Sequence, residues 1–347
     1  MSGSGSPTQR PLTKELAAEL VQRSLGPVGV VSGASELGGG GFASVWRVDL
    51  ADGRSVVLKT TPPPEAVLLS YEQGLLAAEA DYFRRVRREL AGMPVPEVLH
   101  LGSDPEHGDW MVMSLLPGTP LSELGAGPTA DGAEGPDGAV RYELGRALAR
   151  LHTLDGSFFG YPGAGRRSAP TWRAAFLGII DDLLADADRL GFHLPLPATE
   201  IRRIITSASD VLDAVQHPAL VHFDLWDGNV LAEPALDGTG LRLSGLVDGE
   251  RWLYGDPLVD FVSPVLFGAI EDEDGHPLLR GYASVAHEQG DWTWNADTVT
   301  RVRLYRAWLY LVMNVELPTR GEERAARYRD SLAALLRTAL DSVAGAA

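Results

Sequence analysis

The feature that most constrains the fold of this chain is a polar run enclosed by two apolar ones. Ala219-Leu220-Val221 leads into the polar run, residues 222–229, and Val230-Leu231 follows it. The run is HFDLWDGN, and it matches H-x-D-x-x-x-x-N at all three fixed positions, His222, Asp224 and Asn229. A polar turn between two short strands would have a similar composition. The spacing also has a chemical use, because an Asp can accept the proton of a hydroxyl while an Asn five residues later binds Mg²⁺.

A second aspartate follows another apolar strand. Leu246-Val247 ends in Asp248, nineteen residues after Asn229, and Gly249 and Glu250 come next. A carboxylate at this point could supply a second oxygen ligand to the same metal ion. Because Asp-Gly is also an ordinary turn signal, this segment gains its meaning from its order relative to the others.

Two further segments lie near the N-terminus. Residues 38–45, GGGGFASV, fit G-x-G-x-F-x-x-V with Ala43 in place of a third glycine. Lys59 ends an apolar strand fourteen residues after Val45. Glycines let backbone N–H groups approach phosphate oxygens, and a lysine at a strand end can hold them. A flexible hairpin and a solvent-facing lysine are the ordinary alternatives. Since Lys14 is the only other lysine, Lys59 indicates a chemical requirement that Arg does not meet.

The periodicity along the chain predicts an α+β fold with two lobes. Turn and strand signals near the N-terminus favour a small antiparallel sheet with one main helix, and helical patterns dominate from residue 142. We expect helices at 13–24, 71–91 and 172–190, strands at 28–38, 43–49, 55–60, 97–102 and 110–115, and a β-rich interlude at 220–248. The expected divisions are a tail and helix at 1–27, of which residues 1–11 resemble a disordered tail, a nucleotide-binding small lobe at 28–114, and a large lobe at 115–347 that carries the catalytic loop and the acceptor site.

The charge and composition of the chain limit the binding partners and the cellular compartment that we expect for it. The formal net charge is −17, and a strongly acidic chain is a poor ligand for nucleic acid. The chain has no cysteine, no apolar run long enough to span a membrane and no apolar leader. We therefore expect a cytoplasmic monomer or homodimer with no nucleic-acid or membrane partner. The acidity would suit a cationic substrate, although solubility is the ordinary reason for it.

Taken together, these segments resemble the aminoglycoside phosphotransferase superfamily, which includes fructosamine kinases, choline kinases and bacterial antibiotic kinases. VHFDLWDGNVL is similar to its HGDLWxGN form, and GLVDGERWLYGDPLVDF to its D-x-E…GDPxxD segment. MVMSLLPGTPL and YELGRALARLHTL resemble its hinge and the helix after it. The resemblance covers about residues 30–345 and implies the two-lobed protein-kinase-like fold. It also implies an ATP-dependent kinase that uses Mg²⁺ and acts on a hydroxyl-bearing small molecule.

The resemblance assigns roles to individual residues. Asp224 would be the catalytic base, and Asn229 and Asp248 would hold Mg²⁺. Lys59 would grip the nucleotide phosphates and pair with a helix glutamate, for which Glu79 is the first choice and Glu72 the second. The expected nucleotide-binding residues are Gly39, Gly40, Gly41, Val45, Lys59, Glu79 and the hinge residues Ser114 and Leu116. The expected supporting residues are His222, Asp256 and Asp260, and for both aspartates capping of a helix is an equal alternative.

The sequence constrains the acceptor substrate less than it constrains the catalytic and nucleotide-binding residues. Candidate acceptor-binding residues are Asp181 and Asp182 in the helix 172–190, Glu271 and Asp272, and the motif residues Asp227 and Glu250. Carboxylates would attract a polycationic antibiotic, although solvated helix and loop faces look the same in a sequence. The favoured acceptor is an antibiotic or another sugar-containing natural product, which would make the chain a resistance or self-protection enzyme.

Two alternatives remain open at this stage. The first is a metabolic kinase of a ketosamine, homoserine, choline or sugar. The second is a pseudokinase-like binding module, against which the retention of Lys59, Asp224, Asn229 and Asp248 argues. Phe223 stands where protein kinases carry Arg, and neither D-F-G nor A-P-E occurs, which argues against a protein kinase controlled by its activation loop.

Overall fold

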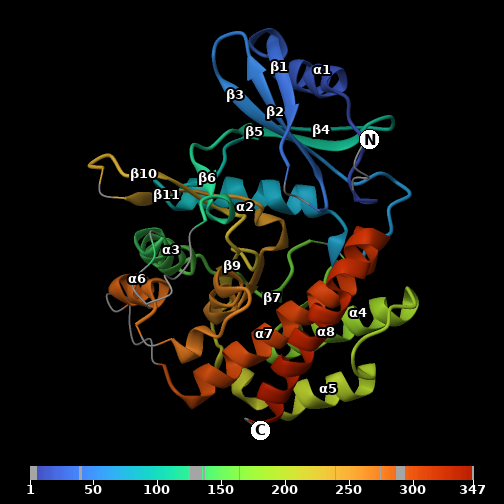
Figure 1. The fold of residues 1–347 in the computed structure, drawn as a ribbon, viewed down its shortest axis with the longest axis vertical. Coiled ribbons are helices and arrows are strands. Elements are labelled where there is room, and N and C mark those ends of the chain that lie inside the picture. Colours follow the sequence, from blue (N-terminus) through green and yellow to red (C-terminus); the bar gives the residue numbers. More distant parts are fainter. Residues whose placement is uncertain are drawn as a thin grey trace.

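The chain folds into a small sheet lobe above a larger helical lobe (Figure 1). The computed structural model describes residues 6–38, 41–125, 135, 137–163, 165–238, 240–273, 275–286 and 294–345. The α+β, protein-kinase-like fold expected from the sequence is confirmed. Among the residues described, none of the helices is both long and apolar enough to cross a membrane.

The small lobe is built on a five-stranded antiparallel sheet with the order β1-β2-β3-β5-β4. Side chains alternate between the two faces, so Val48 and Leu58 point one way while Val45 and Lys59 point the other. The predicted strands are confirmed to within a few residues. Their bounds are β1 (Val31–Glu36), β2 (Ser44–Leu50), β3 (Ser55–Thr60), β4 (Val98–Asp104) and β5 (Gly108–Ser114).

Helix α1 (Lys14–Leu25) covers the outer face of this sheet. Thr13 caps it by accepting a hydrogen bond from the Leu16 N–H, and Leu20 and Val21 are buried against Trp46. The region 13–24 therefore packs on the small lobe. The expectation of a disordered tail over residues 1–11 is wrong for residues 6–11, because these are ordered and Thr8 is fully buried. Residues 1–5 lie outside the described part of the chain.

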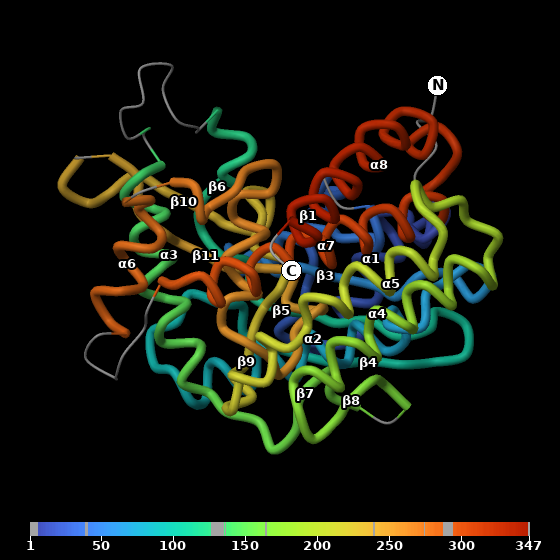
Figure 2. The backbone as a smooth tube through the Cα atoms, turned by 90° about the horizontal axis from the view of Figure 1, so that it is seen from below, coloured from blue at the N-terminus to red at the C-terminus, as the bar shows by residue number. Residues whose placement is uncertain are grey.

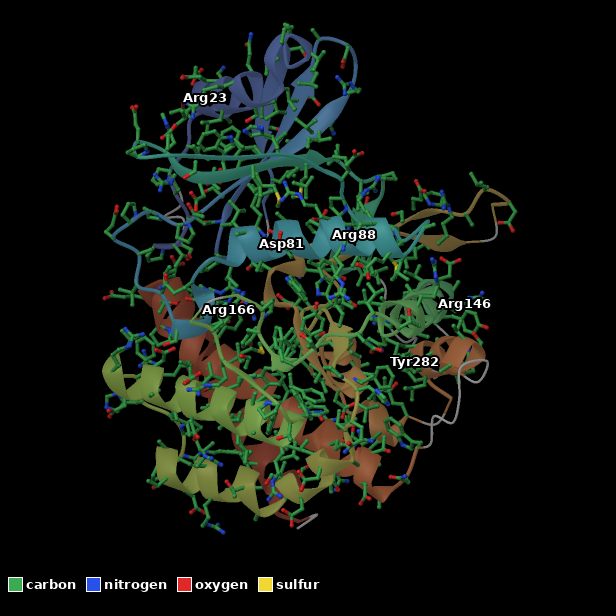
Figure 3. All side chains as sticks on the ribbon, turned by 180° about the vertical axis from the view of Figure 1, so that it is seen from behind. Arg23, Asp81, Arg88, Arg146, Arg166 and Tyr282 are labelled. Carbon is green, nitrogen blue, oxygen red and sulfur yellow. The ribbon has the colours of Figure 1, made fainter. Side chains whose placement is uncertain are left out.

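Helix α2 (Leu75–Glu89) covers the inner face and separates the sheet from the large lobe (Figure 3). It begins four residues later than the periodicity suggests, because Gly74 adopts a left-handed φ of 70°. Residues Ser70–Glu72 instead form a separate short 3₁₀ turn, η2. Tyr82 and Phe83 are buried in the main core, whereas Asp81 and Arg88 lie on the exposed side of the helix.

The large lobe has two groups of helices, which Figure 2 shows on opposite sides of the molecule. In the first group the helices α3 and α6 approach closely, since a Cβ at Gly145 or Gly281 would collide with a backbone carbonyl of the other helix. The second group is built around α7. The bounds are α3 (Gly138–Leu151), α4 (Trp172–Arg189), α5 (Ala198–Ser207), α6 (Pro277–Ala286), α7 (Ala296–Glu316) and α8 (Glu322–Ala344).

Short strands between these helices carry the motif residues. The polar run 222–229 connects β9 (Ala219–Val221) to β10 (Val230–Pro234), and Asp248 follows β11 (Leu241–Leu246). Strand β10 pairs with β11 and with β6 (Thr119–Pro120), just after the link between the lobes. Strand β12 (Leu253–Gly255) joins β9 to β7 (Phe159–Gly160), which pairs with β8 (Ser168–Ala169). The β-rich interlude thus holds the motif loops below the small-lobe sheet.

Candidate active site

Lys59 lies at the end of β3 on the inner face of the sheet. It pairs across the strands with Val45 on one side and Met111 on the other, so the three side chains share that face. The residue is only 2% exposed. An ammonium group buried to this extent needs close partners of opposite charge.

Three carboxylates supply those partners. The Lys59 Nζ lies 2.8 Å from Glu79 of α2, 2.7 Å from Asp248 and 2.7 Å from Glu250. The expected pair with Glu79 is therefore present. Glu72, the second choice, lies in η2 and is paired with Arg320 instead.

The charges in this cluster perturb one another. Burial opposes the charge of Lys59, but the carboxylates of Asp248, Glu250 and Glu79 override it and raise the pKa of Lys59 well above its usual value. Burial raises the pKa of Glu79 to about 8, and the charges of Asp248 and Glu250 add to this effect against Lys59. Partial burial also opposes the charge of Asp248, whose side chain is 39% exposed, yet Lys59 keeps the pKa of Asp248 below its usual value. One ammonium faces three carboxylates, so the cluster can accept further positive charge.

Glu250 lies in a different place from the one expected. It was a candidate for binding the acceptor, but it is buried against Lys59, beside Glu79 and Asp248. The reason is the backbone at Asp248, whose left-handed φ of 58° starts the 3₁₀ turn η5 (Gly249–Arg251) and turns Glu250 back toward the sheet. Oxygen atoms of Glu79, Asp248 and Glu250 lie within 4.8 Å of one another, a grouping that could hold a metal ion.

The loop 222–229 is fixed from below by Asp260. Its carboxylate accepts hydrogen bonds from the N–H groups of His222 (2.9 Å) and Phe223 (2.6 Å) and contacts the His152 Nε2 at 3.1 Å. The hydroxyl of Ser263 accepts from the Leu225 N–H at 2.8 Å. Asp260 belongs to the GDPLVDF segment and Ser263 follows it by two residues, so this stretch of the chain braces the loop.

His222 also supports the loop. Burial lowers its pKa, so the imidazole is neutral near pH 7. Its Nε2 lies 3.1 Å from the Val247 carbonyl oxygen, which joins the loop to the residue before Asp248. Asp256 does something different: it caps the turn η6 (Pro257–Phe261) and binds Arg301 and Tyr305.

Asp224 and Asn229 are five residues apart in the loop and are joined by a hydrogen bond. The Asn229 Nδ2 donates to the Asp224 carbonyl oxygen at 2.8 Å, which leaves the Asn229 Oδ1 for another partner. The Asn229 carbonyl oxygen accepts from the Val247 N–H at 3.1 Å, next to Asp248. The Asp224 side chain keeps about a fifth of its surface exposed. The loop that carries the Asp224 carboxylate and the Asn229 amide is thus joined through Val247 to Asp248, which contacts Lys59.

Arg251 is a site residue that sequence reasoning missed. Its Nε lies 3.5 Å from the Asp224 carboxylate and is buried without a hydrogen-bond partner among the residues described. Its Nη2 lies 3.0 Å from Glu316 at the end of α7, and its guanidinium lies over the ring of Tyr71. Because arginine supplies nearly every cation of this chain, no compositional signal distinguishes Arg251.

The hinge and the glycine loop are only partly described. The Ser114 N–H donates to the Glu97 carbonyl oxygen at 2.9 Å, so this N–H is already engaged and could not also bind an adenine ring. Leu116 packs against Gly245 of β11. Gly39 and Gly40 lie outside the described residues, whereas Gly41 is described.

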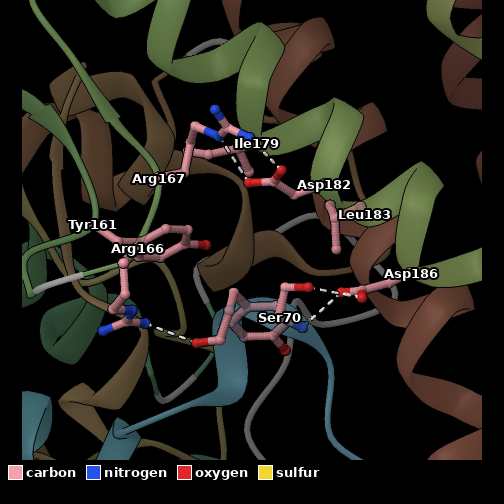
Figure 4. A pocket seen from close by; sticks show the side chains of 10 residues that line it. Ser70, Tyr161, Arg166, Arg167, Ile179, Asp182, Leu183 and Asp186 are labelled. Atoms are coloured by element: carbon pink, nitrogen blue, oxygen red, sulfur yellow. Dashed lines mark hydrogen bonds and ion pairs between the residues drawn. The ribbon is translucent and has the colours of Figure 1, made fainter. Parts of the chain in front are cut away.

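Most of the other acceptor candidates are paired in salt bridges away from the loop. Asp181 binds Arg202, Asp182 binds Arg167 at 2.8 Å, and the buried Glu271 carboxylate binds Arg306. Asp272 is exposed. Asp182 lines a small cavity of about 40 Å³ between α4 and η2, where Ser70 binds Asp186 and Arg166 donates to the Tyr71 carbonyl oxygen (Figure 4). A cavity of this size suits water rather than a sugar.

Asp227 lies at a larger hollow beside the loop. This hollow has a volume of about 650 Å³, and we call it the acceptor pocket after the role proposed for it below. The Arg141 Nη2 lies 3.0 Å from both carboxylate oxygens of Asp227, and Arg141 also binds Asp137. Charged and apolar residues both line the pocket, among them Asp137, Arg141, Trp226, Asp227, Leu266, Phe267, Glu273, His276 and Arg280.

Comparison with known proteins agrees with this arrangement. A model described as the phosphotransferase enzyme family matches residues 34–297. A homoserine kinase from Ralstonia pickettii (strain 12J) is 27% identical over 186 residues, which cover 52% of this chain and 54% of that protein. The chain thus spans about half the length of the curated relatives it matches.

Two solved structures share the fold over nearly the whole chain. A fructosamine-3-kinase, itself described as putative, from Thermobifida fusca is 23% identical with a TM-score of 0.63, covering 93% of this chain and 99% of its own. A thermostable mutant of the aminoglycoside phosphotransferase APH(4)-Ia is 19% identical with a TM-score of 0.63, covering 94% and 100%. The same APH(4)-Ia has been solved as a ternary complex with AMP-PNP and hygromycin B.

Proposed function

Since the chain belongs to the phosphotransferase enzyme family, we propose that it is a kinase that transfers the γ-phosphoryl group of ATP to a hydroxyl of a small molecule. One observation carries this proposal. The buried Lys59 contacts Glu79 and Asp248, while Asp224 and Asn229 are held beside them by hydrogen bonds through the backbone of Val247. A chain that had kept the fold only to bind partners would have no need of this set.

The chemistry follows from the position of each group. Asp224 would accept the proton of the acceptor hydroxyl as its oxygen bonds to the γ-phosphorus, and the bond from that phosphorus to the ADP oxygen would break. Lys59 would neutralise the nucleotide phosphates. The Arg251 Nε lies 3.5 Å from Asp224 and has no hydrogen-bond partner among the residues described, so it would donate to the phosphoryl group as negative charge moves across that group.

The residues present fit a magnesium ion. Mg²⁺ prefers oxygen donors, and the Asp248 carboxylate and the Asn229 Oδ1 provide them beside a cluster with excess negative charge. Bound there, the ion would supply charge neutralisation for the phosphates. We assign Asn229 and Asp248 to it, because Glu79 is fully buried behind Lys59.

The acceptor pocket favours a large acceptor. Its volume of about 650 Å³ lies within the range of pockets that bind drug-sized ligands, and its wall includes Trp226 and Asp227 of the catalytic loop. Phe267, which is 68% exposed, and Trp226 offer apolar surface for a ring. An antibiotic or another sugar-containing natural product would fill this space, and modification of such a molecule would serve resistance or self-protection.

The charge of the acceptor pocket narrows the class of acceptor substrate further. Three carboxylates, of Asp137, Asp227 and Glu273, line the pocket together with the guanidinium groups of Arg141 and Arg280. Burial lowers the pKa of His276 to about 4, so this residue adds no charge near pH 7. The candidate carboxylates of α4 are also neutralised by arginines. The pocket therefore favours a neutral or weakly cationic acceptor over a polycationic one.

A metabolic kinase is the second candidate, and a specific observation favours it. Two curated relatives, each of which matches about half of this chain, are homoserine kinases. Homoserine is a small amino acid and would occupy only a minor part of the pocket. The two candidates therefore predict different sizes of acceptor.

A mass-spectrometric screen tests the proposal. The protein would be incubated with Mg²⁺, ATP and a panel that contains homoserine, ketosamines, choline, amino sugars, nucleosides, macrolides and aminoglycosides. We expect one added phosphate on a large glycoside, and none with Asp224→Ala, which should still bind ATP. Phosphorylation of homoserine alone would favour the metabolic kinase. Failure of the wild-type protein to bind ATP would overturn the kinase assignment.

A further inference from the structure

Residues 6–10, which we call the N-terminal strap, form a compact turn rather than a loose end. The Gln9 N–H donates to the Ser6 carbonyl oxygen at 2.8 Å, and the Ser6 N–H donates to the Gln9 Oε1 at 3.0 Å. Thr8 at the centre of the turn is fully buried. Buried hydroxyls in proteins have hydrogen-bond partners. The Thr8 Oγ1 lies 2.9 Å from the Ser6 hydroxyl within the strap, and its second partner lies in the glycine loop.

The strap is bonded to the backbone of that loop. The Thr8 Oγ1 donates to the Gly41 carbonyl oxygen at 3.0 Å. The Gln9 Nε2 lies 3.5 Å from the Ala43 carbonyl oxygen, and the Ser44 hydroxyl donates to the Arg10 carbonyl oxygen. Successive residues of the strap therefore follow the chain from Gly41 to Ser44.

The large lobe closes on the same place. Pro7 lies beside Gly321, where a Cβ would come within 3.3 Å of its ring, and the Arg324 guanidinium would come equally near to a Cβ at Gly41. The Arg320 guanidinium lies over the ring of Phe42 at 4.9 Å. Gly321 and Arg324 belong to the start of α8. The strap thus occupies the junction between the glycine loop and the large lobe.

A hydrogen bond that holds the carbonyl oxygen of a peptide also fixes the direction of the N–H in the same peptide. In a planar trans peptide the Gly41 carbonyl and the Phe42 N–H point in opposite directions. With the carbonyl held on Thr8, the N–H must point away from Thr8, and the carbonyl cannot rotate toward a phosphate that it would repel. Glycine loops bind phosphates through such N–H groups.

We propose that Thr8 is a positioning residue for the glycine loop, and that the N-terminal strap sets how tightly the loop holds nucleotide phosphates. The inference rests on the proposed use of this loop for ATP. Thr8 does not contact the reacting atoms; it acts through the peptide between Gly41 and Phe42. The strap also explains why a loop of consecutive glycines adopts a defined path at Gly41.

Three substitutions in the full chain test the inference. Thr8→Val keeps the shape and removes the hydroxyl, and Thr8→Ser keeps the hydroxyl. Thr300→Val is the matched control, because Thr300 donates one similar bond to the Ala296 carbonyl oxygen on the exposed side of α7. The readouts are amide hydrogen exchange of residues 41–44 without nucleotide, and the KM for ATP against kcat.

We expect Thr8→Val to speed exchange at residues 41–44 and to raise the KM for ATP roughly three- to tenfold with a smaller change in kcat, as loss of one hydrogen bond would. Thr8→Ser and Thr300→Val should match the wild-type protein in both measurements. Unchanged exchange and KM in Thr8→Val would overturn the inference, as would a failure of Thr8→Ser to restore them. If the wild-type protein binds no nucleotide, the kinase proposal fails, and the exchange measurement still decides whether Thr8 orders the loop.

Discussion

Phe223 and Trp308 lie face to face, with ring centroids 4.0 Å apart and ring planes inclined by 15°. Phe223 precedes the proposed base Asp224 and adopts a left-handed φ of 72°, which is uncommon for a bulky residue. Trp308 is fully buried at the centre of α7. The orientation of the catalytic loop is therefore set by a ring stack with a helix some eighty residues further along the chain.

Removal of this stack should affect both stability and catalysis. Phe223→Ala should lower the free energy of unfolding by about 3–5 kcal/mol, because it leaves a cavity in the core. It should also lower kcat by about tenfold or more, since the backbone of Asp224 loses its support. Urea unfolding and steady-state kinetics measure the two effects. Phe159→Ala, at a buried site away from the loop, should destabilise the fold while leaving kcat near its wild-type value.

The two lysines of the chain form a natural pair of test and control. Lys59→Ala should raise the KM for ATP or depress kcat by roughly a hundredfold, and it should lower stability by about 3–5 kcal/mol because three carboxylates lose their cation. Lys14→Ala should change neither, because Lys14 is exposed on α1. Lys59→Arg keeps the charge but not the compact shape, so it should recover stability more than activity. Unchanged ATP kinetics in Lys59→Ala would remove Lys59 from the site.

Substitutions at Asp260 and Asp256 distinguish an aspartate that supports the loop 222–229 from one that supports only the overall fold. Asp260→Asn should lower kcat, because an amide cannot accept from both the His222 and Phe223 N–H groups as the carboxylate does. Asp256→Asn should cost a similar stability, about 1.5–3 kcal/mol, with little change in kcat, since its partners are Leu258, Arg301 and Tyr305. Thermal unfolding and kcat would be measured for both variants. Equal losses of kcat would contradict the assigned difference.

The contact between Lys59 and Glu79 is implied by the family resemblance, and the periodicity of the sequence places the two residues in a strand and a helix. The α+β architecture and the strand positions could be predicted from that periodicity. The position of Glu250 could not, because it depends on a single left-handed residue, Asp248, whose φ no periodic pattern encodes.

Contacts between residues that are far apart in the sequence also could not be predicted. Arg251 depends on Glu316, and Gly41 depends on Thr8 in a segment whose composition suggests disorder. The sequence contains these residues but not their partners. Acidic residues such as Glu271 also look available in a sequence, and only the fold brings Arg306 to them.

His276 should make stability depend on pH. Burial, and next the charge of Arg141, lower its pKa to about 4 in the folded protein, against about 6.5 when unfolded. The unfolded chain therefore binds more protons between these values, so this group destabilises the fold as the pH falls from 6.5 toward 4. The loss should approach about 1.4 kcal/mol per pH unit in that window. His276→Asn should reduce the difference in unfolding free energy between pH 7 and pH 5, whereas His193→Asn at an exposed site should not.

Arg251 offers the sharpest test of charge placement at the proposed base. Its guanidinium reaches Glu316 and the vicinity of Asp224 at once, and the single ammonium of a lysine cannot span both. Arg251→Lys should therefore lower kcat roughly ten- to a hundredfold while leaving the Kd for ATP within a few-fold of wild type. Arg85→Lys is the matched control, because Arg85 also combines an ion pair with a ring contact, to Glu89 and Tyr254, on the far side of α2. A fall in ATP affinity that accounts for the whole loss of kcat/KM would instead make Arg251 a nucleotide ligand, with no part in the transferring step.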